Sequence, residues 1–476
     1  MHSSVQATFA ATLVDEWVRA GVAHAVVSPG SRSTPLALAL AAADEEGRLT
    51  LHVRLDERSA GFFALGLGLA TRRPAVVVTT SGTAAVELHP AVVESHQARV
   101  PLVACTADRP PELHHVGAPQ TVEQAHLFAG AVRWSVEPGV ARAEAATTWR
   151  SLASRMVAEA VAGPLGPGPV HANLTFVEPL TGSPGPLPPG RPGGRPWHRV
   201  EAAPLAPASD VVAELAGWAG RRGLVVAGAG AGGADPRAVG AMAGALGWPV
   251  LADPRSGLRL DRPGTVAAAD ALLRGPGWAR SHRPDVVLRL GAPWASKVLG
   301  AWLAGSGAEQ FVVDPDGSWP DPDRTAGTVV RADPGLLCRA VARRAGGGGG
   351  GGAPDARAER LGPAYGSIDV SASRPDRPAG LQEPAANPRP GRPSGAVPPV
   401  QAGPWLAGWI EAESTAQAAL DAVLAAQPVP TEPALARALV RSLGPAATLV
   451  VASSMPVRDL EWFVPATPAP PRVLAN

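Results

Sequence analysis

The sequence predicts an α/β protein whose sheets are parallel and covered by helices on both faces. Strand-length segments such as 75–80 and 101–106 are continuous apolar runs, which is typical of strands buried on both sides. Amphipathic, helix-length segments alternate with these runs, and polar clusters follow directly where several of the runs end. Ligands in such folds bind at the carboxyl ends of the strands, so these clusters are the first candidates for a functional site.

The first domain is expected to span residues 1–180. Its strands are predicted at 24–28, 50–54, 75–80, 101–106 and 169–174, and its helices at 6–20, from Thr34, from near Asp56, after Ser81-Gly82-Thr83 and at 146–162. Because helices alternate with these strands, neighbouring strands are expected to pair in parallel.

Three further parts are expected after this domain. A proline-rich linker (184–204) leads to a second α/β domain at 205–344, with a helix at 208–220 and strands at 224–227, 249–252, 286–290 and 310–313. Residues 345–404 are low in complexity and are interpreted as a flexible linker or insertion. The last part, 405–476, is expected to hold helices at 405–426 and 431–443 and strands at 448–452 and 472–475. These elements are too few to close a core, so the sequence is expected to end inside a domain.

Composition excludes several classes of protein. The formal net charge is +1 and no basic stripe is present, which argues against nucleic-acid binding. The apolar runs are far shorter than the roughly 20 residues that cross a bilayer, and the first residues do not resemble a signal peptide, so we expect no membrane segment and a soluble, cytoplasmic protein. Cys105 and Cys338 belong to no disulfide or zinc pattern and are predicted to be buried hydrophobic residues.

Arginine side chains follow two of the predicted strands. Ser31 and Arg32 come after the strand at 24–28, and Arg109 comes after the strand at 101–106. A guanidinium offers a fixed fork of donors that matches a carboxylate or a phosphate. The spacing alone also allows surface salt bridges with neighbouring acids, and the two interpretations remain open here.

Two helix starts carry further candidates. Glu57 falls in the first turn of a predicted helix, where an acid commonly only stabilises the helix dipole, with Asp56 the better candidate for the cap. The apolar residues that follow Glu57 allow it to face a drier interior, where it could exchange protons. Ser81, Gly82 and Thr83 open another helix and offer backbone N–H groups to an anion, although such starts are common.

The second and third domains contribute weaker candidates. The glycine run at 228–233, with Asp253 about 20 residues on, has the form of a dinucleotide loop and keeps a nicotinamide or flavin enzyme among the alternatives. Lys297, the only lysine in the sequence, follows the strand at 286–290. Ser454 and Arg458 follow the strand at 448–452 and lie four residues apart, so a helical turn would point both the same way. Surface positions are equally compatible with these three residues.

Five motifs, taken together, resemble one family of enzymes. They are Val27-Ser28-Pro29-Gly30-Ser31-Arg32-Ser33-Thr34-Pro35, Leu55-Asp56-Glu57-Arg58-Ser59-Ala60-Gly61-Phe62, Thr79-Thr80-Ser81-Gly82-Thr83-Ala84, Thr106-Ala107-Asp108-Arg109-Pro110-Pro111-Glu112-Leu113 and Ser453-Ser454-Met455-Pro456-Val457-Arg458-Asp459. Their order and spacing are similar to those of the 2-succinyl-5-enolpyruvyl-6-hydroxy-3-cyclohexene-1-carboxylate synthases, thiamine-diphosphate enzymes of menaquinone biosynthesis. The resemblance covers the whole chain except the low-complexity segment.

The resemblance implies an architecture and a reaction. It implies a pyrimidine-binding domain at 1–180, a Rossmann-like central domain without a nucleotide role, and the beginning of a diphosphate-binding domain at 405–476. The implied transferase decarboxylates 2-oxoglutarate on thiamine diphosphate and adds the resulting carbanion to isochorismate, in a homodimer or homotetramer. Thiamine supplies the electron sink, and the protein supplies orientation and electrostatics.

Residue roles also come from the resemblance. Glu57 is implied as the catalytic carboxylate that hydrogen-bonds N1′ of the aminopyrimidine, beside a cofactor loop that contains Ser81, Gly82 and Thr83. The residues implied to hold the substrate carboxylates are Ser31, Arg32, Arg109, Gln120, Lys297, Ser454 and Arg458. One departure is Glu87, where a residue such as asparagine is more typical, and this puts pyrimidine contacts in doubt if Glu87 faces the cofactor.

The resemblance also sets an expectation for the end of the chain. The family continues past Asn476 to a Gly-Asp…Asn motif that binds Mg²⁺ (or Mn²⁺) and the diphosphate, and no such motif occurs in this sequence. We therefore expect no metal ligand here and a C-terminally truncated chain that is inactive alone. The alternative is a non-catalytic fragment that binds carboxylated metabolites or an intact partner subunit.

Overall fold

The computed structural model describes residues 4–163, 165–201, 203–347 and 403–475. Within these residues the chain forms two compact units, the first ending at Ala203 and the second beginning at Pro204. Most of the low-complexity segment expected at 345–404 lies outside the described residues. Each unit is described by itself.

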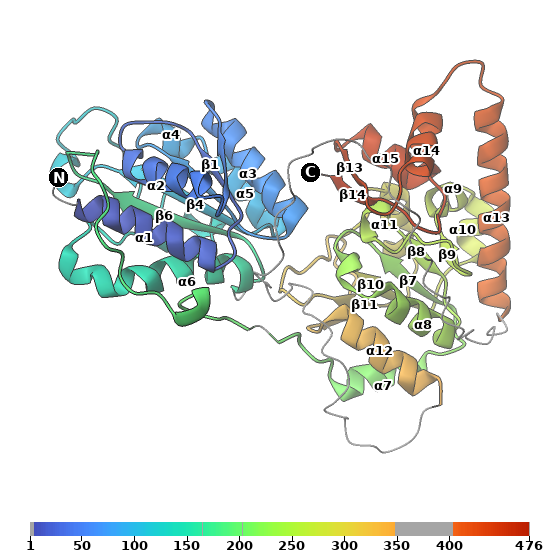
Figure 1. Ribbon diagram of the computed structural model, residues 1–476. Coiled ribbons are helices and arrows are strands. Elements are labelled where there is room, and N and C mark those ends of the chain that lie inside the picture. Colours follow the sequence, from blue (N-terminus) through green and yellow to red (C-terminus); the bar gives the residue numbers. More distant parts are fainter. Residues whose placement is uncertain (1–3, 164, 202, 348–402, 476) are drawn as a thin grey trace, which may run out of the picture. The chain divides into compact units, whose positions relative to one another are not determined.

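Unit 1 is built on one parallel sheet. Its strands are β1 (His24–Val27), β2 (Thr50–Val53), β3 (Ala75–Thr79), β4 (Leu102–Asp108), β5 (Trp134–Val136) and β6 (Pro169–Thr175), in the order β2-β1-β3-β4-β6-β5. Every pairing is parallel (Figure 1). The prediction of a parallel sheet is therefore confirmed. The central strands β3 and β4 are buried along their whole length, as their apolar sequences predict.

Helices cover both faces of this sheet. They are α1 (Val5–Arg19), α2 (Thr34–Glu45), α3 (Glu57–Thr71), α4 (Thr83–Val86), α5 (His89–Ala98) and α6 (Trp149–Ala162). One hydrophobic core joins a sheet face to α1, α2 and α6 through side chains such as Trp17, Leu40 and Met156. A second core joins the other face to α3 and α5 through Ala64 and Val92. The two cores explain why the strands read as continuous apolar runs.

Three details of unit 1 differ from the sequence interpretation. Strand β4 extends to Asp108, so Asp108 belongs to the strand and Arg109 is the first residue beyond it. The short strand β5 was not predicted. Strand β6 is buried throughout but is not an apolar run, because His171, Asn173 and Thr175 alternate with apolar residues along it.

Unit 2 contains a second parallel sheet. Its strands are β7 (Gly223–Ala227), β8 (Val250–Ala252), β9 (Thr265–Val266), β10 (Val286–Leu290), β11 (Glu309–Val313) and β12 (Thr328–Val330), in the order β12-β11-β10-β7-β8-β9. Helices α7 (Ser209–Gly217), α8 (Pro236–Leu246) and α12 (Pro334–Ala345) pack on one face, and α9 (Ala269–Leu273), α10 (Pro276–Ser281) and α11 (Lys297–Ala304) on the other. Strands β9 and β12 were not predicted.

The glycine run at 228–233 is occupied by the protein's own backbone. Gly228 N donates to Leu290 O (2.8 Å), and Ala292 N donates to Ala229 O (2.7 Å). A Cβ atom on Gly228 would lie 1.6 Å from Ala292 O, so glycine is needed for this close approach. The helix that follows begins only at Pro236, and Asp253 pairs with Arg255 at 2.8 Å. The loop therefore lacks both features expected of a dinucleotide site, a helix that begins at the glycines and an unpaired acid for the ribose. This removes the basis for the nicotinamide or flavin alternative.

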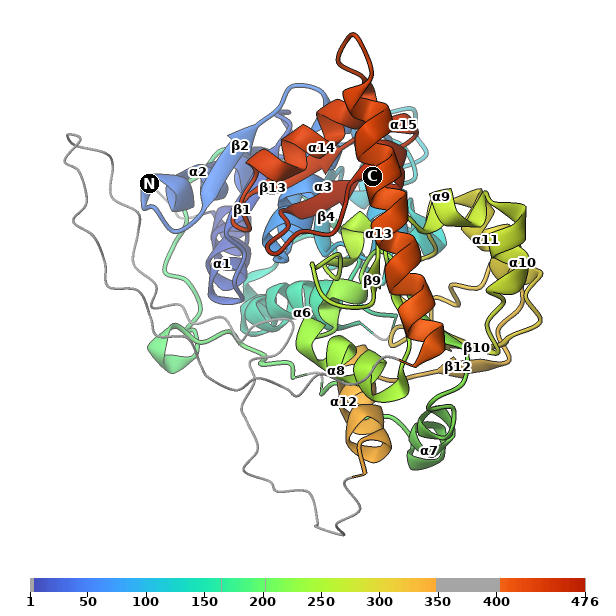
Figure 2. The ribbon, with the colours of Figure 1, turned by 90° about the vertical axis from the view of Figure 1, so that its right-hand side faces the viewer.

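The C-terminal part of unit 2 packs against the central domain. It consists of α13 (Pro404–Ala425), α14 (Glu432–Ser442), β13 (Thr448–Val451), α15 (Met455–Phe463) and β14 (Arg472–Ala475). Helix α13 lies beside β9 and α9 (Figure 2), and its Trp409 is fully buried in the core under α11. The two-stranded sheet has only a small core of its own, with Val440, Leu460 and Val473. Among the described residues no helix is both long enough and apolar enough to cross a bilayer.

Candidate functional site

The predicted residues of unit 1 gather at one edge of its sheet. Because its strands are parallel, their carboxyl ends all meet at this edge. Ser31 and Arg32 follow β1, Glu57 follows β2, Ser81 follows β3, and Arg109 follows β4. Sequence order and topology therefore bring to one edge five residues that are spread over 79 positions (109 minus 31, plus one).

Arg109 connects the loop after β3 with the loop that contains Gln120. Its Nη1 donates to Ser81 Oγ and to Gln120 O (2.8 Å), while Gln120 Nε2 donates to Ser81 O (3.1 Å). Gly82 has a φ of +80°, and a Cβ there would lie 2.9 Å from Gln120 Cγ. Glycine is therefore required both by the backbone conformation and by the close approach. Thr83 begins α4 and its side chain is exposed.

Arg32 is a buried cation with unused donor capacity. Its Nη1 donates to Phe176 O (3.0 Å) and its Nη2 lies 3.5 Å from Glu178 Oε1, while its Nε has no partner. Burial lowers the pKa of the Arg109 guanidinium, and the nearby charge of Arg32 lowers it further. Two neighbouring cations that repel each other, Arg32 buried and Arg109 half-buried, favour an anionic ligand between them. Arg32 does pair with an exposed acid, Glu178, as the salt-bridge alternative from the sequence allowed, but the arginine itself is only 7% exposed.

Ser31 and Glu57 present side chains that nothing in the described chain engages. Ser31 is exposed, and its carbonyl accepts from Thr34 Oγ1 at 2.7 Å, which shapes the start of α2. Glu57 is half-buried at the first position of α3. Asp56 caps that helix, as predicted, by accepting from Ser59 N at 2.9 Å.

The charged neighbours of Glu57 are engaged elsewhere. A hydrogen bond from Arg58 lowers the pKa of Asp56 to about 2. Glu87, the family departure noted from the sequence, is exposed, and its Oε2 lies 3.8 Å from Arg58 Nε. The Glu57 carboxylate therefore remains available to a ligand.

A buried polar network supports this edge from below. Gln124 Oε1 accepts from Gly82 N (2.8 Å), and Gln124 Nε2 donates to Asn173 Oδ1 (2.9 Å). Asn173 Nδ2 donates to Asp108 Oδ2 (2.8 Å), and Asn173 Oδ1 also accepts from Thr106 Oγ1 (2.9 Å). The network thus fixes the Ser81–Gly82 turn and, through Asp108, the start of the Arg109 loop.

His171 completes the network as a neutral ring. Burial lowers its pKa to about 4, and its Nε2 lies 2.8 Å from Thr106 Oγ1. Because the single hydroxyl proton of Thr106 points to Asn173, His171 Nε2 must carry the proton in this contact. Sequence reasoning missed these residues, although the alternation of polar residues along 169–175 is a signal that could have found them.

Removal of the Gln124 side chain tests this network. We expect Gln124→Ala to lower the free energy of unfolding of unit 1 by about 2–3 kcal/mol, because it leaves the buried N–H of Gly82 without its partner and removes one of the two donors to Asn173 Oδ1. Urea unfolding followed by tryptophan fluorescence measures this loss. Gln97→Ala, the same change at an exposed position of α5, should stay within about 0.5 kcal/mol of wild type. Equal effects of the two changes would contradict a structural role for the network.

A hollow in unit 2 brings together Lys297 and Arg458. Its volume is about 310 Å³, and it is lined by Asp270, Arg274, Ala295, Lys297, Val298, Met455, Arg458 and Trp462. Lys297 begins α11, whose cap Ser296 accepts from Leu299 N (3.1 Å) and donates to Asp270 Oδ2 (2.5 Å). Ser454 is the exposed residue before α15, next to the lining residue Met455, and is not itself part of the lining.

Arg274 adds a third cation that sequence reasoning did not consider. Its Nε donates to Asp270 Oδ1 at 2.5 Å, and its Cζ lies 5.1 Å from the ring centre of Trp462. The hollow therefore has three basic side chains and one carboxylate, and that carboxylate is already held by Arg274 and Ser296. The arrangement favours an anionic ligand.

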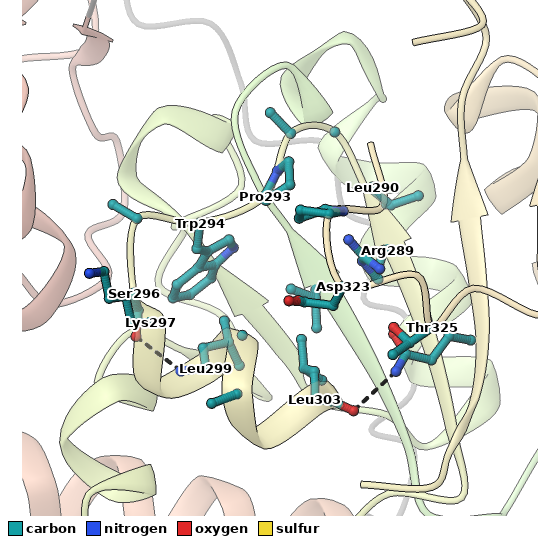
Figure 3. A pocket seen from close by; sticks show the side chains of 18 residues that line it. Arg289, Leu290, Pro293, Trp294, Ser296, Lys297, Leu299, Leu303, Asp323 and Thr325 are labelled. Atoms are coloured by element: carbon teal, nitrogen blue, oxygen red, sulfur yellow. Dashed lines mark hydrogen bonds between the residues drawn. The ribbon is translucent and has the colours of Figure 1, made fainter. Parts of the chain in front are cut away.

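A second, mostly apolar pocket adjoins this hollow. It has a volume of about 370 Å³ and lies between the sheet and α11 (Figure 3). Arg289 at its wall is already paired with Asp321 at 2.7 Å. Lys297 lines both spaces, and in Figure 3 its side chain lies on the side away from Arg289. Lys297 thus belongs more to the cationic hollow than to the apolar pocket.

The remaining predictions concern cysteines and metals. Cys105 and Cys338 are free and fully buried, as predicted, and burial raises the pKa of both thiols, that of Cys338 to about 12. Across residues 4–163, 165–201, 203–347 and 403–475, no three His, Cys, Asp or Glu side chains group in a way that could hold a metal ion.

Known proteins resemble this chain over most of its length. Residues 7–127 match the family described as "Thiamine pyrophosphate enzyme, N-terminal TPP binding domain", and residues 193–345 match "Middle domain of thiamine pyrophosphate". The relatives that carry the name 2-succinyl-5-enolpyruvyl-6-hydroxy-3-cyclohexene-1-carboxylate synthase include the following three proteins. The protein of Halobacterium salinarum is 46% identical over 364 residues, covering 71% of this chain and 60% of the relative. That of Myxococcus xanthus is 38% identical over 498 aligned residues, covering 100% and 73%, and that of Geobacillus kaustophilus is 37% identical over 488, covering 98% and 73%.

These alignments cover enough of the relatives to assign the family. The match spans 60% of the Halobacterium salinarum relative and 73% of the Myxococcus xanthus relative. The two family matches fall on the two parallel-sheet domains, which agrees with the α/β architecture described above. The chain belongs to the 2-succinyl-5-enolpyruvyl-6-hydroxy-3-cyclohexene-1-carboxylate synthase family of thiamine-diphosphate enzymes.

Proposed function

We propose that this protein takes part in the decarboxylation of 2-oxoglutarate and the addition of the product to isochorismate, the transferase reaction of menaquinone biosynthesis. The observation that carries the proposal is the hollow in which Lys297, Arg458 and Arg274 meet in a member of this family. Both substrates are carboxylates, and three convergent cations are suited to bind them.

The residues of unit 1 fit the pyrimidine end of thiamine diphosphate. When bound, the cofactor supplies the electron sink that decarboxylation of a 2-oxo acid needs. The Glu57 carboxylate is free to hold N1′ of the pyrimidine and to exchange a proton there. Ser28 Oγ and Thr79 Oγ1 are buried without partners at the same edge, which leaves polar capacity for a ligand. Ser81, Gly82 and Thr83 would form the adjoining cofactor wall.

The metal end of the cofactor has no counterpart among the described residues, since they contain no group of three potential ligands. We therefore assign no step to Mg²⁺ or Mn²⁺ through residues of this chain. The roles proposed here are limited to proton exchange by Glu57 and to substrate binding.

Two groups of side chains are proposed to bind substrate carboxylates. In unit 1 they are Ser31, Arg32, Arg109 and Gln120, of which Arg109 and Gln120 are directly linked. In unit 2 they are Lys297, Ser454 and Arg458. Guanidinium forks would bind planar carboxylates in two-pronged fashion, and the ammonium of Lys297 would act as a point charge. We further propose a cytoplasmic homodimer or homotetramer, which light scattering on the purified protein would test.

The first experiment measures turnover and binding together. The protein is incubated with thiamine diphosphate, Mg²⁺, 2-oxoglutarate and isochorismate, and isochorismate loss and carbon dioxide release are followed. Coupled loss and release would support the proposal. Isochorismate binding without turnover would favour the alternative, a non-catalytic protein that binds carboxylated metabolites or an intact partner subunit.

Arg458→Ala tests the substrate role of the hollow. We expect affinity for the carboxylate substrates to fall by about 10–100-fold, since a charged hydrogen bond is worth about 1.5–3 kcal/mol. Titration calorimetry with each substrate measures the change. Arg280→Ala removes the same charge from an exposed position of α10 and should have little effect. If both variants bind equally weakly, net charge rather than a contact at Arg458 explains the affinity.

A further inference from the structure

The helix that carries Arg458 also holds the loop that carries Lys297. One turn beyond Arg458, the side chain of Glu461 is only 1% exposed, and its Oε2 accepts from Ala295 N at 3.1 Å. Ala295 lines the hollow and precedes Lys297 by two residues. The Glu461 carboxylate therefore connects the helix that carries Arg458 to the loop that leads to Lys297, although the two cations are 161 residues apart in sequence (458 minus 297).

Helix α15 is itself fixed by a different residue. Arg259 is buried, and its guanidinium donates to Leu460 O, Glu461 O and Val464 O at 2.7–2.8 Å. These carbonyls lie in and just after the last turn of the helix, where backbone acceptors run out of helical partners; of the three, Leu460 O also accepts from Val464 N at 3.3 Å. Because Arg259 holds the backbone of α15, the Glu461 side chain is not needed to anchor the helix. Its contact with Ala295 acts on the loop.

Burial of the Glu461 carboxyl group at this position has a free-energy cost. Its Oε1 is buried without a partner. Burial, and after it the charge of Asp253, raise the pKa of the carboxyl to about 7, against the lowering effect of Arg259, the Ala295 N–H and Arg255. A buried carboxylate with one unsatisfied oxygen does not stabilise a fold by itself. Its contribution is better understood as geometric.

We propose that Glu461 is a positioning residue that sets the separation of Lys297 and Arg458 through its bond to Ala295, and so tunes the hollow for a substrate with more than one carboxylate. The inference rests on the proposed function for its consequence in binding. The contact itself does not depend on that function. Loss of the bond would let the loop 293–297 move relative to α15, and small displacements of positioning elements have large effects on bound substrates.

The test compares Glu461→Ala with Glu461→Gln, which keeps an oxygen acceptor without the charge. We expect hydrogen–deuterium exchange at the Ala295 amide to accelerate at least about tenfold in Glu461→Ala and to stay close to wild type in Glu461→Gln. The matched control is Glu413→Ala, because Glu413 Oε2 accepts in the same way from Ala267 N (3.1 Å) and Ala268 N (2.9 Å). That variant should expose the amides of 267 and 268 and leave Ala295 protected.

Substrate binding supplies the second readout. We expect the dissociation constant for isochorismate to rise about tenfold or more in Glu461→Ala and to be restored in Glu461→Gln. Unchanged exchange at Ala295 in Glu461→Ala would overturn the proposal. So would faster exchange with unchanged affinity. If wild-type protein binds no carboxylate substrate but Ala295 exchange still responds to Glu461, the proposed function fails while the structural connection stands.

Discussion

In an intact synthase that carries these residues, Glu57→Gln is expected to abolish turnover while leaving the fold intact. The glutamine keeps the size of the side chain but cannot exchange a proton with the pyrimidine, and a positioned acid–base group contributes about 10²–10⁴-fold to a rate. The fold should not change, because the Glu57 side chain makes no contact on which α3 depends; Asp56 caps that helix. Isochorismate consumption measures the rate, and a thermal melt measures stability, both against wild-type protein that turns over under the same conditions.

Glu87→Gln is the matched control for this substitution. Glu87 is exposed, lies 3.8 Å from Arg58, and carries the same charge in the same unit. We expect this variant to keep most of the wild-type rate. A Glu57→Gln enzyme with the wild-type rate would show that the proton-exchange role is wrong. A large loss in Glu87→Gln would instead show that the departure from the family at this position matters for the cofactor.

Arg259→Met is expected to cause the largest loss of stability in unit 2. The five donors of this buried guanidinium meet five backbone carbonyls, those of Ala252, Ala267, Leu460, Glu461 and Val464. Methionine fills much of the space but donates to none of them. We expect the free energy of unfolding to fall by about 3–5 kcal/mol, as when a buried charged group is removed from its partners. Urea unfolding followed by tryptophan fluorescence measures the loss.

Arg222→Met provides the comparison, since Arg222 is 53% exposed and pairs with Asp285 at 2.6 Å. Exposed ion pairs contribute about 0–1 kcal/mol, so this variant should unfold near the wild-type urea concentration. If Arg259→Met is equally mild, the bonds to α15 are not what holds the C-terminal part against the central domain. Exchange of the α15 amides would then remain slow in both variants.

The parallel sheets could be predicted because burial on both faces leaves a direct mark on the sequence. Runs such as 75–80 and 286–290 contain few polar residues, and their ends fell within one residue of the observed strands. The Asp56 cap was equally predictable, since a cap depends on residues three apart in the chain. The five motifs indicated the family from order and spacing alone. Local physics therefore accounts for most of the fold.

What escaped prediction depends on contacts between distant segments. Arg259 donates hydrogen bonds to carbonyls of α15, about 200 residues further along the chain. The residues around Arg259 in the sequence give no indication of these partners. Arg274 has no motif, and its place in the hollow follows from the packing of α9 against α15. The glycines at 228–233 gave a misleading signal, because the same absence of side chains admits either a pyrophosphate or, as here, the carbonyl of Ala292.

Because the carboxyl of Glu461 is buried, the folded and unfolded states bind different numbers of protons at intermediate pH. Its ordinary pKa of 4.5 rises to about 7 in the folded chain. Between these values the folded protein holds a proton that the unfolded chain has released, so folding takes up a proton from the buffer. The free energy of unfolding therefore falls as the pH rises through this window, by an amount on the order of 3 kcal/mol. The heat of unfolding of unit 2 near pH 6 will accordingly include the ionisation heat of whichever buffer accepts that proton.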